Sequence, residues 1–429
     1  MKKIITLLAA AGMVVAASAP ASAVDVKMDY RQRISFQAGQ EKFNDQNLEQ
    51  FKNRVRLGLT MAASENLKGY VQFQLLNGTQ FGGATGTHGD NDTTVRQMYI
   101  DWTVPATAVK VRMGRMEMGL PVDAFGENAV MAAGYGSRDG IVVTSPVTDW
   151  LGLSALWTRT NYDTDANEKH DLDNNKSDDI YAAIASMKFN GVKADVYAAY
   201  ATLDGASAKY AVKGSNGSTL PAFEGNAYWL GFTSTISMFD PFTLKLSAAY
   251  GEASADNGHD KDQKGWNVQA KASYKTAYGT PVLGAWYFSG DDKGENKNGI
   301  MPSVQGAFTP TKWYHDGSKG LHGGSSYENP QGNWGIQLGI EKVSFINGLS
   351  HDFLVSYIAG TNDKANTSKA DYLTTEDSFV SFDLINTYQI YKNLAAHLQL
   401  NYTIADFEDE TKTFGKDDYG FELTFEYKF

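Results

Sequence analysis

Basic side chains recur at alternating positions in three short segments, and apolar residues occupy the positions between them. In an extended strand, alternate residues lie on the same face, so each segment gathers its positive charges on one side. A row of fixed positive charges along an aqueous space favours anions over cations. The residues predicted to form this basic row are Lys27, Arg31 and Arg33 in the first segment, Lys52, Arg54 and Arg56 in the second, and Lys110 and Arg112 in the third, with Arg115 near its end.

Carboxylates gather in the segment that follows the third basic set. Residues 117–135 lack strand-like alternation and carry Glu117, Asp123 and Glu127. Opposite the basic row across a narrow aqueous gap, these acids would create a transverse electric field, which aligns polar solutes and disfavours apolar ones. The competing interpretation is that the basic side chains are simply solvated and neutralised by the acids. The density of basic residues on adjacent segments favours the field.

The elements that must hold these charges are β-strands. Apolar and polar residues alternate over about ten positions along the whole chain, the length that a tilted strand needs to cross a bilayer. We expect eighteen strands, or sixteen if two short ones fail, and no helix of three turns. The strands are predicted to begin near Val26, Phe51, Leu67, Thr94, Val109, Arg138, Leu151, Asp179, Val192, Asn226, Pro241, Lys264, Thr280, Gly332, Leu349, Ser378, Leu394 and Asp418.

Connections between these strands alternate in length, which is typical of transmembrane barrels. Aromatic residues near strand ends on the apolar faces fit the girdles that such barrels place at membrane interfaces. We therefore predict an all-β fold, a single transmembrane antiparallel β-barrel of 16–18 strands. Short turns are expected at 63–66, 105–108, 190–191, 239–240 and 391–393, and long polar loops at 77–93, 164–178, 203–225, 291–331 and 361–377.

The first 23 residues have the pattern of a secretory signal peptide, with Lys2 and Lys3, an apolar run and a small-residue site at 21–23. The mature protein is then one domain spanning 24–429. No later apolar run reaches the length of a membrane-spanning helix. The chain contains no cysteine, which excludes disulfides and thiolate chemistry. Its formal net charge of −11 argues against nucleic acid as a partner.

The last strand has an almost wholly aromatic apolar face. Unpaired backbone groups are costly in lipid, so this strand is expected to close the barrel against the first strand at 28–37. Closure would set Glu422 and Glu426 beside the first basic set. The apolar face consists of Tyr419, Phe421, Leu423, Phe425, Tyr427 and Phe429.

These segments together resemble the trimeric general diffusion porins of Gram-negative outer membranes. Residues 419–429 are similar to the terminal strand that the barrel-assembly machinery reads in that family. Residues 56–59, 67–73 and 111–115 resemble its second, third and fifth strands, and residues 121–127 resemble the turn of its constriction loop. The resemblance implies an inward-folded constriction loop after the fifth strand.

The resemblance further implies a homotrimer that forms a water-filled channel for passive diffusion of small hydrophilic solutes and ions. The other partners expected on this interpretation are outer-membrane lipid and lipopolysaccharide. Neither a cofactor nor an enzymatic activity is expected, since the motifs G-x-S-x-G and H-E-x-x-H are missing from the sequence.

Two departures from that family keep alternatives open. Arg96 shares its parity with apolar residues, so that either a bulge intervenes or Arg96 lies at the rim. Eighteen strands is the number of the sugar-specific porins, and a channel specific for sugars or small anions is therefore the first alternative. Such a channel would show aromatic residues along its lumen, for which Tyr70, Tyr99 and Tyr197 are candidates. An outer-membrane barrel enzyme or adhesin is the remote alternative.

A partial calcium motif occurs in one acidic loop. Asp171, Asp173 and Asn175 have the spacing of the first three ligands of a calcium loop, but Lys176 replaces the required glycine and Ala182 the final glutamate. The favoured interpretation is a solvated loop, with loop-bound calcium as the alternative.

Overall fold

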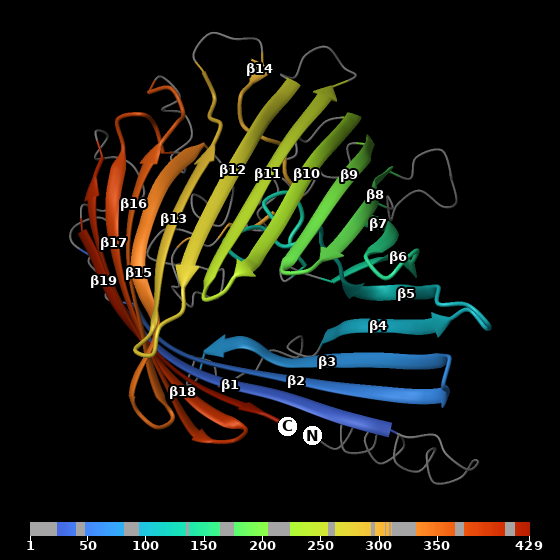
Figure 1. The fold of residues 1–429 in the computed structure, drawn as a ribbon, viewed down its shortest axis with the longest axis horizontal. Coiled ribbons are helices and arrows are strands. Elements are labelled where there is room, and N and C mark those ends of the chain that lie inside the picture. Colours follow the sequence, from blue (N-terminus) through green and yellow to red (C-terminus); the bar gives the residue numbers. More distant parts are fainter. Residues whose placement is uncertain are drawn as a thin grey trace.

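The computed structural model describes residues 24–39, 48–80, 94–133, 137–163, 176–204, 224–255, 262–292, 297–304, 306–308, 310, 332–364, 373–407 and 417–429. The expected signal peptide and the partial calcium motif lie outside these residues. Long antiparallel strands follow one another around a closed ring (Figure 1).

Eighteen strands of a nineteen-stranded sheet make the wall of the barrel, which confirms the all-β fold and the higher of the two expected strand numbers. A further strand, β14 (Lys297–Asn298), has two residues that pair in parallel with β12. The wall strands are β1 (Val24–Gly39), β2 (Leu48–Ser64), β3 (Leu67–Gln80), β4 (Thr94–Thr103), β5 (Lys110–Glu117), β6 (Ser137–Pro146), β7 (Leu151–Asp163), β8 (Lys176–Phe189), β9 (Val192–Asp204), β10 (Glu224–Phe239), β11 (Phe242–Ala255), β12 (Asp262–Tyr274), β13 (Thr280–Phe288), β15 (Asn333–Ile346), β16 (Leu349–Gly360), β17 (Ser378–Tyr391), β18 (Leu394–Asp406) and β19 (Asp417–Lys428).

The barrel closes where the last strand meets the first. β19 pairs with both β18 and β1, and Met28 and Phe429 exchange backbone hydrogen bonds of 2.9 and 3.1 Å. The register sets Glu426 opposite Arg31 and Glu422 opposite Ser35. The predicted closure is therefore confirmed, and it brings acidic positions of β19 next to the first basic set.

Short and long connections lie at opposite ends of the barrel, because consecutive strands run in opposite directions. Two residues join β2 to β3, β8 to β9 and β17 to β18. At the other end the connections are longer, such as those between β7 and β8 and between β9 and β10. No helix in the described part of the chain is long and apolar enough to cross a membrane.

The two faces of the wall differ in what covers them. Along β15, buried and exposed residues alternate from Asn333 onward, and the exposed set is apolar, with Leu338 63 % exposed. Inward-facing residues such as Gln337 and Tyr197 are almost completely buried. They are buried because segments of the chain that leave the wall fill much of the interior. The largest buried apolar cluster joins Tyr197 and Trp229 on the wall to Val130, Met131 and Val304 on two inward segments.

Candidate channel constriction

The first inward segment follows β5, as predicted, and lies inside the ring of strands (Figure 1). It leaves and returns at a narrow neck, where the Leu120 amide donates to the Met131 carbonyl at 2.9 Å. The guanidinium of Arg138, on β6, donates from Nη1 to the carbonyl oxygens of Met118 and Ala132, one on each arm of the neck. Arg138 is only 4 % exposed. One buried arginine therefore holds both ends of the segment.

The tip of this segment crosses the lumen and contacts the opposite wall. The Ala124 amide donates to Ser247 Oγ on β11 at 3.1 Å. Phe125 meets Trp286 on β13 edge to face, at 5.2 Å between ring centroids. A Cβ atom at Gly284, beside it on β13, would lie 2.5 Å from the Phe125 ring. Glycine is thus required there for the tip to approach the wall.

Asp123 does not face the basic wall, contrary to the sequence prediction. Its carboxylate is 5 % exposed and accepts hydrogen bonds from the Ala129 amide at 2.8 Å and from Gln269 Nε2 at 3.2 Å. Burial raises the pKa of Asp123 to about 7, although these hydrogen bonds favour the charged form. The prediction failed because the tip crosses the lumen completely, so that its acid closes the turn instead of lining the aqueous space.

This buried acid makes the docking of the tip dependent on pH. The pKa of Asp123 is higher when the tip is docked on the wall than when the tip is free. Docking is therefore strongest below pH 3.8, the ordinary pKa of the group, and weakens as the pH rises to about 7. Above that pH the strength of docking is constant. We expect channel fluctuations to increase between about pH 4 and pH 7 in the natural protein. The Asp123→Asn variant keeps an acceptor for Ala129 and carries no charge. Single-channel recording should show its fluctuations to be independent of pH; an equal pH response in both proteins would contradict this role.

A second inward segment, residues 299–308, lies against the first and was not predicted. The amides of Val304 and Ala307 donate to the carbonyls of Val130 and Asn128 at 2.8 and 2.9 Å. Trp229 Nε1 on β10 donates to the Pro302 carbonyl at 2.7 Å. The sequence prediction treated the whole of 291–331 as an external loop. The missed signal was a run of apolar and small residues, from Gly299 to Phe308, inside an otherwise polar stretch.

Basic side chains line the wall of β2 and β5, and each is held by a polar partner. Arg54 Nη2 lies 3.4 Å from Asp29 Oδ1, and Arg56 Nε donates to Gln74 Oε1 at 2.8 Å. Arg112 makes a two-pronged ion pair with Asp101 at 2.6 and 2.8 Å and stacks over Tyr99, 4.2 Å from the ring centroid. Charged groups held in this way present a fixed field to the lumen.

The structure gives less detail for five other members of the basic row. Lys27 is exposed at the end of the barrel and lies 3.8 Å from Asp25. Lys110 lines an inner cavity. For Arg31, Arg33 and Lys52 the structure gives the backbone register only, which sets Arg31 opposite Arg54 and Arg33 opposite Lys52. These pairs place the first two basic sets side by side on one face of the wall.

Arg96 and Glu117 form an ion pair inside the barrel. Of the two positions that the sequence left open for Arg96, a bulge and the rim, the structure shows the bulge. The β3–β4 register shifts between Gln72 and Phe73, so that Arg96 is the additional residue of a bulge. The bulge allows its guanidinium to reach both Gln72 and Glu117. Glu117 acts electrostatically on Glu127, whose pKa is raised first by burial and then by this second negative charge.

Arg115 lies on the outer face, contrary to the prediction that it lines the lumen. It is paired in register with Met98, which is 61 % exposed on the outside of β4. Its Nη1 lies 2.9 Å from Asp139 Oδ2 on β6. The physical reason is strand parity, since residues three apart on a strand point to opposite faces.

A cavity of about 630 Å³ remains between the wall and the neck of the first segment. Its lining brings together charges of both signs from β3, β4 and β5. Tyr70 and Tyr99 lie in contact on this side of the lumen, at 5.0 Å between centroids, whereas Tyr197 is buried and its hydroxyl lies 3.5 Å from Asn128 Nδ2. The charged residues that line the cavity are Glu65, Lys68, Asp101, Lys110, Arg112 and Glu117.

Comparison with solved structures finds the same fold in outer-membrane porins of Pseudomonas aeruginosa. The chain is similar to OpdL, with a TM-score of 0.59 and 14 % identity over 95 % of this chain and 98 % of that one. OpdQ gives 0.58 and 15 %, over 95 % and 98 %. OpdK, solved with vanillate, gives 0.56 and 13 %, over 94 % and 98 %. No protein-family model and no curated protein matches the sequence.

Proposed function

We propose that this protein is an outer-membrane porin through which small hydrophilic solutes diffuse passively, and that it belongs to the solute-specific class. The observation that carries the proposal is that two inward segments, and not one, enter the lumen and are joined to each other by hydrogen bonds. A lumen narrowed in this way selects among solutes by size and charge. General diffusion, the first expectation from the sequence, requires a wider opening.

The charge of the lumen supports small anions as the preferred solutes. Arg54, Arg56 and Arg112 lie on neighbouring parts of one wall, each fixed by a polar partner. The structural neighbour OpdK was solved with vanillate, a small aromatic carboxylate. A carboxylate passing along this wall would exchange water for guanidinium donors at successive positions. The acids in the same space, Asp101 and Glu117, keep each binding position weak enough for release.

Charge removal on the wall tests this preference. The double variant Arg54→Ser, Arg56→Ser should lower the ratio of anion to cation permeability, because two fixed positive charges leave the lumen. The measurement is the reversal potential across a planar bilayer under a salt gradient. The matched control is Lys392→Ser, which removes an exposed cation in the two-residue turn between β17 and β18 and should leave the potential unchanged. An unaltered ratio in the double variant would contradict the role of the wall.

Assembly is a separate proposal. The homotrimer implied by the resemblance to general porins is testable by the native mass of the detergent-extracted protein. Structural likeness to OpdL and OpdQ concerns the fold of one chain. A trimer mass would support the general-porin resemblance, and a monomer mass would remove it.

A further inference from the structure

The outer face of β5 to β8 carries a row of alternating charge at one level. Arg115, Asp139, Arg159 and Asp179 are cross-strand partners in consecutive strands. Arg115 pairs with Asp139 at 2.9 Å, and Arg159 makes two contacts of 2.8 Å with Asp179. The Arg115 and Asp139 side chains are 46 % and 64 % exposed. This row lies toward the end of the barrel that has the long connections.

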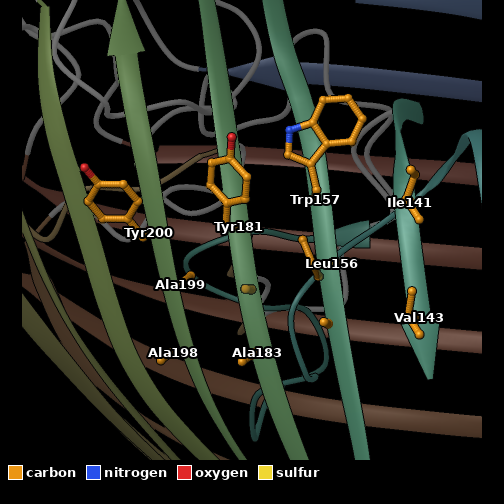
Figure 2. A pocket seen from close by; sticks show the side chains of 11 residues that line it. Ile141, Val143, Leu156, Trp157, Tyr181, Ala183, Ala198, Ala199 and Tyr200 are labelled. Atoms are coloured by element: carbon orange, nitrogen blue, oxygen red, sulfur yellow. The ribbon is translucent and has the colours of Figure 1, made fainter. Parts of the chain in front are cut away.

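An aromatic row lies directly below the charged one, toward the short turns. Trp157, Tyr181 and Tyr200 are partners in register on β7, β8 and β9. Figure 2 shows their rings side by side, with both tyrosine hydroxyls on the same side. The Arg159 guanidinium lies 5.8 Å from the centroid of the Trp157 ring. Aromatic residues with a polar end mark the boundary between hydrocarbon and headgroups in membrane barrels.

A hollow of about 580 Å³ lies below the aromatic row on the same outer face (Figure 2). Ala155, Ala183 and Ala198 form its floor and are partners in register. The aromatic side chains wall it on one side, and Val143 lies at its β6 end (Figure 2). It crosses four strands, so its length is three inter-strand spacings, roughly 14 Å. A hollow of this shape and apolar lining fits a hydrocarbon chain.

We propose that this outer face binds lipopolysaccharide, with an acyl chain of lipid A in the hollow and a phosphate at Arg115. The inference rests on the proposed function, which sets the long connections outside the cell and therefore this face in the outer leaflet. Charge complementarity identifies the headgroup. Arg115 uses one of its five N–H donors on Asp139, and others are available to a phosphate. Exposed Asp139 can accept from the amide and hydroxyl donors of the glucosamine units.

A second copy of the chain fits the same face less well. In a twofold contact the same patch would face itself, so two hollows would meet and leave a void. The charged row would also be buried in such a contact and would lose its hydration. An amphiphile with a chain and a polar head fills the hollow and keeps the charged row at the aqueous boundary.

The test is native mass spectrometry of the folded protein in detergent, with purified hexa-acylated lipid A as the probe. The natural protein should retain one lipid A under activation that strips detergent. Retention should fall about tenfold in Ala183→Phe, which fills the hollow, and in Arg115→Gln, which removes the phosphate donor. That fall corresponds to roughly 1.4 kcal/mol of binding free energy. The control Ala285→Phe adds the same ring at an exposed position on β13 and should retain lipid A.

Three results would overturn the proposal. Equal retention in all four proteins would show a non-specific lipid shell, and equal retention of phosphatidylglycerol would show that any phosphate lipid suffices. An oligomer mass lost only in Ala183→Phe would identify a second copy as the occupant. If Ala183→Phe fails to fold, Arg115→Gln still decides. The adduct measurement needs no ion flow, so a protein that conducts without retaining lipid A removes this inference alone, and a folded protein that does not conduct removes the proposed function.

Discussion

Replacing Arg138 with methionine should raise the single-channel conductance by roughly twofold and make the current fluctuate. The reason is that the neck of the first inward segment loses the side chain that donates hydrogen bonds to both of its arms. Methionine fills similar space but donates no hydrogen bond. The carbonyls of Met118 and Ala132 would then be left without this donor in a buried place. Each unsatisfied buried group costs about 1–3 kcal/mol, which favours release of the segment toward water.

The released segment should leave the lumen wider without unfolding the barrel. The wall strands β5 and β6 keep their backbone pairing from Lys110 to Glu117, so folded protein is expected, as checked by gel mobility with and without heating. Arg138→Lys retains a cation and N–H donors on a shorter side chain, and should give an intermediate current. Lys275→Met removes an exposed cation in the turn between β12 and β13 and should have no effect. A quiet, unchanged current in a folded Arg138→Met protein would contradict the role of Arg138.

Replacing Gly306 with valine should produce the second large effect, separation of the two inward segments. A Cβ atom at Gly306 would lie 1.9 Å from the Ala129 carbonyl oxygen and 2.3 Å from Ser303 Oγ. Backbone cannot yield by that amount in place, so the second segment must move away and the bonds from Val304 and Ala307 to the first segment must break. We expect a larger conductance and weaker discrimination between sugars of different size in liposome swelling.

The control for this substitution is a glycine with room around it. A Cβ atom at Gly152 on β7 would meet nothing closer than the Ser145 carbonyl oxygen at 3.8 Å, so Gly152→Val should conduct and discriminate as the natural protein does. If Gly306→Val discriminates between sugars as sharply as Gly152→Val, the two segments do not define the opening together.

The wall of the barrel could be predicted from the sequence because strand alternation is a local property. Each of the eighteen predicted strand starts, Val26 and Asp418 among them, falls within a few residues of an observed strand start. The aromatic face that ends at Phe429 predicted closure against β1 correctly. Strand alternation alone would also have placed Arg115 on the outer face, because it lies three residues from Arg112. Its positive charge led instead to its grouping with the basic row.

The interior could be predicted only in part, because it depends on contacts between distant segments. That a loop after β5 enters the lumen followed from a family resemblance, but the burial of Asp123 depends on Ser247 and Gln269, more than 120 residues away. The bulge that turns Arg96 inward is a register shift between β3 and β4. Alternation within a single strand cannot reveal such a shift.

Current recording across a planar bilayer tests most directly whether the barrel is an aqueous channel narrowed by its inward segments. The purified, folded natural protein should insert with discrete conductance steps. A variant in which residues 119–132 are replaced by a short Gly/Ser linker should insert with clearly larger steps. Folded protein that inserts without steps, or equal steps in the two proteins, would contradict the account.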